Sequence, residues 1–559
     1  MPHWDWLVLT ILLALAGLAP RLGQRWFRPI EAAFARLAAR RTFTVALIFF
    51  AAIVLRLSLL PLIPVPVPGN HDEFAYLLQA DTFAHGRLAN PPHPLWLSFE
   101  TFHVNWFPTY SGMFPPAQSF VLAMGQLLGH PWIGVLLSTA AMAASIVWML
   151  QGWMPARWAF LGGVITVLKL GLISYWVNSY WGGAVAAAGG ALILGALPRI
   201  IRNQRLRDAL LLGLGVAILA NTRPLEGLIF CLPAAGALLL WLGGRSSPPL
   251  RLTFRRVVAP LAVLTVLLAG FVGYYNWRLT GNALLMPHVL NTRTYHTTGL
   301  FLWQPQKPPL HYHNPEMEFF YNSWARNQYN RTWDDVRSAS QEKLENYSEV
   351  FFWPGAFPLL FCLPLLFRDR RTRLLLVTLL LNALGLFAVV WSLPHYAAPV
   401  TCVLYALLLQ CLRHLRTIRF AGRPVGMGLS RLIILLLLFT VGLGLYQRID
   451  DPYAWDWNGN MGNWRRAAVS AKLRQMPGKQ LAIVRYGKNH NIHEEWVYNA
   501  ADIDASKVVW ARDMGPEQNR KLLDYFRGRQ VWLIQPEDDP EGVTPFEKPP
   551  AASPPPGQP

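Results

Sequence analysis

Long apolar blocks recur along the whole chain, and they constrain its fold more than any other feature. Twelve blocks of about 14 to 21 residues alternate with short stretches that are basic or rich in Pro and Gly. They run approximately over residues 5–20, 43–63, 132–150, 157–175, 183–198, 208–221, 225–242, 257–276, 350–367, 374–392, 397–412 and 431–447. The sequence therefore predicts an all-α polytopic membrane bundle of about twelve transmembrane helices, with a small extramembrane α/β domain at its C-terminal end.

The composition supports lipid as the solvent of most of the chain. Of its residues, 53% are hydrophobic and 14% are charged, against roughly a quarter charged in soluble domains. The formal net charge of +19 suggests nucleic acid as one partner. The arginines lie mostly in short loops between apolar blocks, however, which is where the positive-inside rule places them. We therefore expect the lipid bilayer as a partner and no nucleic acid.

Basic loops also predict the orientation of the chain. Arginine clusters follow the first, fifth and ninth blocks, at 21–41, 199–207 and 368–373. Clusters of this kind are typical of cytoplasmic loops. An even number of predicted crossings separates each basic loop from the next, so the loops 245–256 and 413–431 are also expected in the cytoplasm. Both termini, the loops 64–131 and 277–349 and the tail from 448 are expected outside. The predicted location is a bacterial inner (plasma) membrane, with the two long loops and the tail on the periplasmic side.

Four regions are predicted along the chain. Residues 1–42 form an extra N-terminal transmembrane helix and a cytoplasmic amphipathic helix, since the start MPHWDW lacks the positive charge of a signal peptide. Residues 43–447 form the transmembrane catalytic domain. Residues 448–536 form the periplasmic α/β domain, because LAIVRYG, KVVWARD and QVWLIQP are strand-like. Residues 537–559, acidic and Pro-rich, are expected to be a disordered tail.

The segment 69–94 contains residues typical of the two ends of a helix, and it carries two adjacent carboxylates. Asn70 or Asp72 suits its start and Gly86 its end, so Asp72 and Glu73 fall in the first turn. One interpretation is structural: Asp72 only caps the helix, a contribution of about 0.3–1 kcal/mol. Asp81 lies nine residues further on and therefore faces the other side of the helix, so no carboxylate pair is expected.

Short motifs in this region and beyond resemble those of a known family. They are His71-Asp72-Glu73 in the first long external loop, Phe114-Pro115-Pro116 before the next crossing, the long loop 277–349 and the stretch 394–399 (PHYAAP). In this order they are similar to the GT-C glycosyltransferases, specifically bacterial relatives of protein O-mannosyltransferases and of the aminoarabinose transferase of lipid A. The resemblance covers residues 43–447. The first helix, the α/β tail and the second external loop, with Asn178, Tyr180 and Trp181 instead of an acidic pair, depart from it.

The resemblance implies a reaction. A hexosyl or pentosyl unit would pass from a polyprenyl-phosphate-linked donor to an acceptor glycan, lipid or protein on the non-cytoplasmic face, with inversion at the anomeric carbon. Asp72 is expected to be the general base that deprotonates the acceptor hydroxyl. Glu73 is expected to position Asp72 or to help it hold a divalent cation, Mg²⁺ or Mn²⁺. No cofactor is firmly implied.

Further side chains are candidates for the two substrates. The donor phosphate needs cations and hydrogen-bond donors, for which Arg223, His395, Tyr396 and Arg293 are available. Two structural interpretations stay open: Arg223 could pair with Glu226, and His395 could be an interfacial ring beside Tyr396. The candidates for lining the acceptor and sugar site are His71, His103, Asn105, Tyr180 and Trp181.

Two other function classes remain open. A multi-pass transporter or flippase of a polar or lipid-linked substrate would also need polar groups inside a bundle. The absence of a clear internal repeat and the place of the acidic motif in an external loop favour the enzyme. A non-catalytic scaffold whose external tail recruits partners would need the tail but not Asp72.

Overall fold

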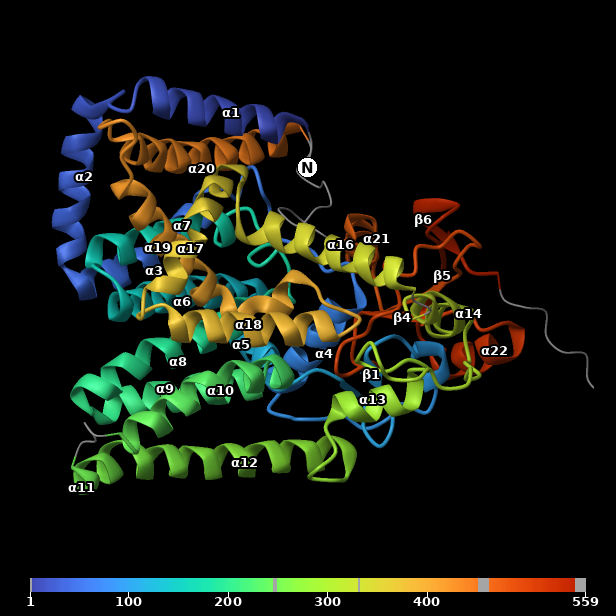
Figure 1. Ribbon diagram of the computed structural model, residues 1–559. Coiled ribbons are helices and arrows are strands. Elements are labelled where there is room, and N and C mark those ends of the chain that lie inside the picture. Colours follow the sequence, from blue (N-terminus) through green and yellow to red (C-terminus); the bar gives the residue numbers. More distant parts are fainter. Residues whose placement is uncertain (1–2, 245–248, 330–331, 451–461, 548–559) are drawn as a thin grey trace, which may run out of the picture.

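The computed structural model describes residues 3–244, 249–329, 332–450 and 462–547, and it consists of a helical bundle with a small α/β domain at one end (Figure 1). Each of the twelve apolar blocks lies on helical structure. Among the described residues, seven helices are long and apolar enough to cross a membrane, or eight if a bent pair counts as one span. The chain is a multi-pass membrane protein. The seven are α3 (Arg41–Ser58), α6 (Pro131–Trp153), α8 (Ala184–Asn203), α10 (Pro224–Leu242), the continuous helix α11–η2–α12 (Leu250–Thr280), η5–α19 (Pro394–Thr417) and α20 (Val425–Asp450).

Four other blocks form helices of only 15 or 16 residues, namely α1 (His3–Leu18), α7 (Ala156–Leu170), α9 (Leu206–Ala220) and α18 (Arg373–Ala388). Such a helix is about 23 Å long, which is shorter than the roughly 30 Å hydrocarbon core of a bilayer. The block at 350–367 is the bent case: α16 (Trp333–Phe351) turns by 105° into η4 (Pro354–Cys362) and α17 (Leu363–Arg368). The count of twelve crossings therefore stays a prediction, whereas the helical nature of the blocks is confirmed.

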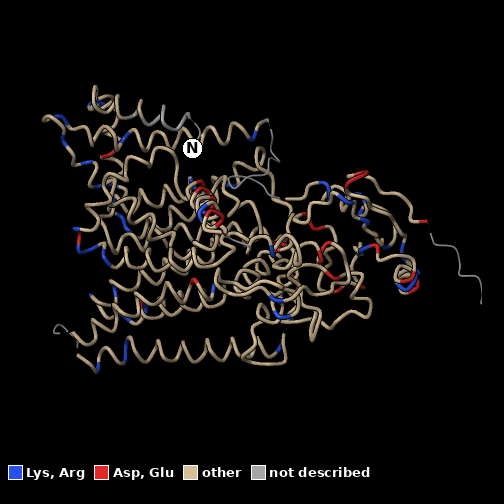
Figure 2. The backbone as a smooth tube through the Cα atoms, turned by 45° about the vertical axis from the view of Figure 1, so that its right-hand side comes forward, with Lys and Arg blue, Asp and Glu red and all other residues tan. Residues whose placement is uncertain are grey.

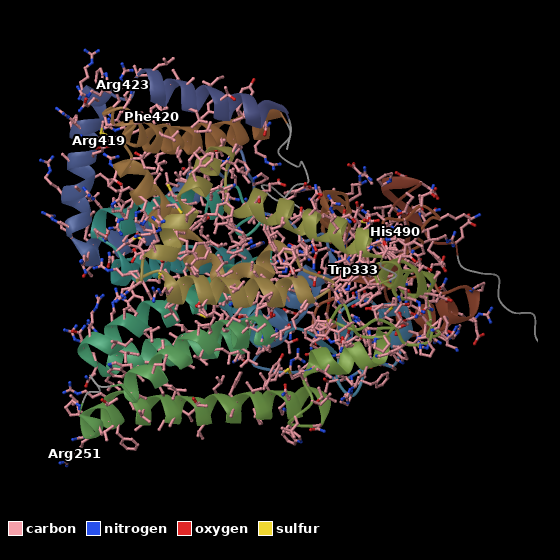
Figure 3. All side chains as sticks on the ribbon, viewed as in Figure 1. Arg251, Trp333, Arg419, Phe420, Arg423 and His490 are labelled. Atoms are coloured by element: carbon pink, nitrogen blue, oxygen red, sulfur yellow. The ribbon has the colours of Figure 1, made fainter. Side chains whose placement is uncertain are left out.

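One end of the bundle is basic. The helix α2 (Gln24–Ala39) runs across this end, roughly perpendicular to the long helices, as the amphipathic pattern of 24–41 predicts (Figure 1). Lys and Arg of the bundle lie mainly at this end, and Asp and Glu lie mainly at the other (Figure 2). Arg251, Arg419 and Arg423 mark the basic end in Figure 3. The arginine-rich loops thus share one side of the molecule, opposite the α/β domain.

The other end carries the long loops, which are folded. The first contains α4 (His71–Ala84), the 3-10 turn η1 (Trp96–Phe99), the short antiparallel pair β1 (Val104–Asn105) and β2 (Ser111–Gly112), and α5 (Pro116–Leu127). The second contains α13 (Pro287–Tyr295), α14 (Pro315–Phe319), η3 (Phe320–Trp324), α15 (Ala325–Asn327) and most of α16. Short helices dominate both loops because capping residues and prolines punctuate them closely.

The tail forms an α/β domain, as its strand-like segments predict. It comprises α21 (Trp464–Gln475), β3 (Gln480–Val484), β4 (Val508–Arg512), α22 (Pro516–Tyr525), β5 (Gln530–Gln535) and β6 (Asp539–Pro545). The sheet order is β4-β3-β5-β6, with the first three strands parallel and β6 antiparallel to β5. The predicted start of disorder at 537 is wrong, because β6 pairs with β5 and Val543 packs against the domain core. Residues 548–559 lie outside the described residues.

The α/β domain shares a hydrophobic core with the first long loop. Leu78 of α4 and Trp106 pack in one cluster with Leu481 of β3, Val509 of β4 and Leu522 of α22. Polar contacts reinforce this interface: the backbone N–H of Ala501 donates to Asp81 Oδ2 at 2.8 Å, and Arg512 Nη1 donates to Glu316 Oε2 at 2.6 Å. The predicted tail domain is therefore docked onto both external loops.

Candidate active site

A cavity of about 1290 Å³ lies between the loop end of the bundle and the α/β domain. Its lining comes from segments far apart in the sequence: the start of α4, the start of α10, the end of α12, the loop before η5 and the residues 491–494 of the tail. Six of the eleven candidate site residues are on its wall, namely His71, Asp72, His103, Trp181, Arg223 and Tyr396. The fold thus brings the carboxylate and the arginine of the expected reaction into one space.

Asp72 lies in the first turn of α4 but does not cap the helix. Asn70 is the cap, since its side chain accepts a hydrogen bond from the backbone N–H of Glu73 at 3.1 Å. Glu73 completes the capping box by accepting from the N–H of Gly69 at 2.8 Å and from that of Asn70 at 3.4 Å. The Asp72 side chain keeps 28% of its surface exposed and lines the cavity. Asn70 is therefore the cap, and Asp72 lies in the first turn, where its charge still meets the positive end of the helix.

Glu73 has a structural position. Its residue is 1% exposed, and its second oxygen accepts a hydrogen bond of 2.9 Å from the backbone N–H of Tyr180. Both carboxylate oxygens are thus occupied by main-chain amides, and Glu73 does not line the cavity. A cation held jointly by Asp72 and Glu73 does not fit this arrangement. Within the described ranges, no group of three or more His, Cys, Asp or Glu side chains is placed to hold a metal ion.

Arg223 presents its positive charge beside an aromatic ring. It immediately precedes Pro224, the first residue of α10, and its guanidinium carbon lies 4.0 Å from the centre of the Tyr396 ring. Such a cation–π contact fixes the plane of the guanidinium group while leaving its N–H edges available for a ligand. Glu226 also interacts electrostatically with Arg223, although no contact within 4.0 Å joins the two charged groups in the described part of the chain.

The surroundings of Asp72 are rich in histidine. His71, His103, His288, His296 and His493 all line the cavity, and His103 Nε2 lies 4.0 Å from Asp72 Oδ1. Burial lowers the pKa of His71 to about 4 and those of His103 and His296 to about 3, so these rings are neutral at neutral pH.

The electrostatics of Asp72 suit a base. Burial raises the pKa of its carboxyl, and the positive charge of Arg223 opposes that rise. A carboxylate with a raised pKa is a stronger proton acceptor than an exposed one. The cavity therefore holds a carboxylate and a guanidinium group in one partly desolvated space.

Comparisons with known proteins give only a distant likeness. No protein-family model matches the chain, and no curated protein matches it either. Among solved structures, the Archaeoglobus fulgidus oligosaccharyltransferase in complex with Zn and sulfate is 11% identical, with a TM-score of 0.44 over 78% of this chain and 60% of that one. ArnT from Cupriavidus metallidurans, bound to undecaprenyl phosphate, is 14% identical, with a TM-score of 0.43 over 89% of this chain and 92% of that one.

A further structure is that of the archaeal oligosaccharyltransferase AglB from Archaeoglobus fulgidus with an inhibitory peptide and a dolichol-phosphate, at 13% identity and a TM-score of 0.39. The chain spans 60–62% of the length of the archaeal oligosaccharyltransferases it matches. These solved proteins are GT-C glycosyltransferases, the family that the sequence motifs resemble. All three TM-scores are below 0.5.

Besides Glu73, four of the sequence candidates do not line the cavity. His395 is 3% exposed, and its Nδ1 atom lies 3.0 Å from the Tyr175 hydroxyl. Asn105 donates to the carbonyl of Pro287 at 3.1 Å, and the Tyr180 hydroxyl donates to the carbonyl of Pro66 at 2.8 Å. Arg293 is exposed on α13. The expected contacts of these four with phosphate or sugar are therefore not supported, since three form hydrogen bonds inside the protein and Arg293 is exposed outside the cavity lining.

Sequence reasoning also missed several lining residues. Tyr76 lies four residues after Asp72, so helical periodicity alone puts it on the same face of α4. His288, His296 and His493 come from the second long loop and from the tail. Nothing local in the sequence marks these three, because only the docking of both segments over α4 brings them to Asp72.

Proposed function

We propose that this chain is a membrane glycosyltransferase that moves a sugar from a polyprenyl-phosphate-linked donor to an acceptor on the non-cytoplasmic face. The observation that carries the proposal is the presence of Asp72 and of the Arg223–Tyr396 pair on one cavity wall. The cavity lies at the loop end of the bundle, where a lipid-linked phosphate at the membrane boundary would enter. One hexosyl or pentosyl unit fits the reaction that the sequence motifs imply.

The reaction proceeds in one displacement. Asp72 accepts the proton of the acceptor hydroxyl as the acceptor oxygen forms its bond to the anomeric carbon. The bond between that carbon and the phosphate oxygen breaks, and polyprenyl phosphate leaves with the bonding electrons. Arg223 stabilises the negative charge that grows on the phosphate. Because the base and the leaving group act on opposite sides of the sugar carbon, the anomeric configuration inverts.

Orientation follows from charge. The basic end of the bundle, with α2 and the arginine-rich loops, is placed in the cytoplasm by the positive-inside rule. The cavity and the α/β domain then face the periplasm of a bacterium with an inner membrane. A cysteine introduced at exposed Trp333 on the loop end should react with an impermeant maleimide in intact spheroplasts, whereas one at Arg251 should not.

Reconstituted proteoliposomes distinguish transfer from transport. The purified protein is supplied with polyprenyl-phosphate-linked sugars extracted from membranes of the bacterium that produces it. A membrane extract of the same cells serves as the source of the acceptor. A transferase releases free polyprenyl phosphate together with a new glycosidic bond. Movement of the intact lipid-linked sugar across the bilayer without release of polyprenyl phosphate would identify a flippase. If neither transfer nor transport occurs, the scaffold remains as the alternative.

A further inference from the structure

A second cavity, of about 430 Å³, lies in the α/β domain at the carboxyl ends of β3 and β5. These two parallel strands are neighbours, but the chain leaves β3 toward β4 on one side and leaves β5 toward β6 on the other. In open α/β sheets, loops that diverge in this way form a crevice, and ligands bind there. The loop after β3 and the turn after β5 line this cavity.

One carboxylate holds the two loops together. Glu537, in the turn after β5, accepts from the backbone N–H of Gly487 at 2.7 Å and lies 2.6 Å from Nδ1 of His490. The His490 ring also stacks on Tyr486, with ring centres 3.9 Å apart, and its place in the domain is labelled in Figure 3. The cavity wall is thus fixed by hydrogen bonds within the protein, so a ligand meets a preformed site.

The remaining lining offers both hydrogen-bond donors and acceptors. Arg465, Lys488 and Asn489 supply exposed donor groups, while Glu494 and Asp538 supply carboxylates. Trp496 also lines the cavity, is 1% exposed, and has an indole N–H without an acceptor among the residues that the structure describes. Cations and anions are nearly balanced here, which disfavours a polyanion. Sugar hydroxyls, each a donor and an acceptor, match this mixture.

The second cavity adjoins the first. Arg465, Asn491 and Glu494 line both. The same loop touches the start of α4, because the N–H of Glu495 donates to the carbonyl of Gly69 at 3.1 Å and His71 Nε2 contacts the carbonyl of Ile492. A molecule bound in the second cavity therefore has a path to Asp72 along the residues that the two cavities share.

From this juxtaposition we infer that the cavity between the β3 and β5 loops binds the carbohydrate part of the acceptor and presents one of its hydroxyls to Asp72. The inference rests on the proposed glycosyl transfer. It names the acceptor class as a glycan or glycolipid with at least one sugar unit beyond the reacting one.

Binding to the full-length chain in nanodiscs tests the site directly. Maltotriose and chitotriose serve as neutral carbohydrate probes, and an acidic hexapeptide serves as the peptide probe, with binding followed by saturation-transfer NMR and titration calorimetry. At least one trisaccharide should bind. Lys488→Ala and Asn489→Ala should each weaken that binding by about fivefold or more, which is the effect of one lost hydrogen bond. The matched control Lys521→Ala, on α22 and paired with Glu517, should bind as the wild type does.

Three results would overturn the inference: no binding of either trisaccharide, binding that is equal in Lys488→Ala and the wild type, or binding of the peptide alone. Lys488 and Asn489 are exposed, so thermal melting should confirm that both variants fold normally. Asp72→Asn separates this inference from the proposed function. Its trisaccharide binding should be unchanged, whereas its transfer activity should be lost. If the wild type transfers sugar but binds no trisaccharide, only the inferred acceptor site is wrong. If it binds a trisaccharide but Asp72→Asn still transfers sugar, only the proposed role of Asp72 is wrong.

Discussion

Glu73 Oε1 accepts a hydrogen bond of 2.9 Å from the backbone N–H of Tyr180, and this bond ties the first turn of α4 to the second external loop. The two adjacent carboxylates in this turn, Asp72 and Glu73, therefore have different environments. Glu73 satisfies main-chain amides inside the protein, and Asp72, the preceding residue, faces the cavity. One helix turn thus fixes the direction in which the proposed base points.

Glu73→Ala should destabilise the protein. The substitution leaves buried backbone amides without acceptors, and each such group costs about 1–3 kcal/mol of unfolding free energy. We expect a lower melting temperature of the detergent-solubilised protein, with transfer activity falling in parallel. A melting temperature equal to that of the wild type would show that Glu73 does not hold the start of α4.

Asp72→Asn should have the opposite effect on stability. Burial raises the pKa of Asp72 in the folded protein, so the contribution of this carboxyl to stability is present below its ordinary pKa and is lost as the pH rises through the raised value. At neutral pH the neutral Asn variant should therefore melt higher than the wild type. The difference should shrink as the pH falls toward about 4, near the ordinary pKa of Asp. Melting curves between these pH values check the sign, and a wild type that melts higher at pH 7 would contradict it.

Arg223→Gln should weaken the use of the lipid-linked donor. Charge-assisted hydrogen bonds to a phosphate contribute about 1.5–3 kcal/mol, so the donor kcat/KM should fall roughly 10- to 100-fold. Arg223→Lys keeps the charge but loses the planar group that stacks over Tyr396. Its donor kcat/KM should therefore lie between those of the wild type and Arg223→Gln. Steady-state kinetics with varied donor provide the test. Full activity of Arg223→Lys together with strong loss in Tyr396→Leu would show that Tyr396 acts independently of the stack.

Arg512→Ala should loosen the α/β domain. Arg512 is 3% exposed and pairs with Glu316 of the second long loop at 2.6 Å, so its removal leaves a carboxylate in a largely buried position without its cation. Breaking a buried pair in this way costs about 3–5 kcal/mol. Limited proteolysis should then cut between the bundle and the domain much faster than in the wild type. The exposed pair of Arg527 and Asp524 provides the control, since Arg527→Ala should leave the digestion rate unchanged.

Local patterns in the sequence predicted much of this architecture. The apolar blocks, the amphipathic helix α2 and the bounds of α4 follow from hydropathy, periodicity and capping residues, all of which act over a few residues. Short motifs mark Asp72 and Tyr396, whereas Arg223 is a candidate because a phosphate needs a cation. The pairing of β6 with β5 was missed because its acidic, Pro-containing sequence gains its order only from a neighbouring strand.

Tertiary contacts account for the remaining differences. Glu73 and His395 look as reactive in the sequence as Asp72 does, and only their burial against Tyr180 and Tyr175 removes them from the cavity. Conversely, His493 reaches the cavity because the tail docks over α4 through a core that includes Leu78 and Leu481. Neither outcome is encoded within a short stretch of the chain.

Sugar transfer by Asp72→Asn tests the central claim most directly. The variant and the matched control Asp334→Asn, an exposed position on α16, are purified, checked by thermal melting to be folded at the assay temperature and assayed with the lipid-linked donor. A general base contributes about 10²- to 10⁴-fold, so Asp72→Asn should lose at least about 100-fold in turnover while Asp334→Asn keeps the wild-type rate. Transfer at the wild-type rate by the Asp72→Asn protein would contradict the proposed chemistry.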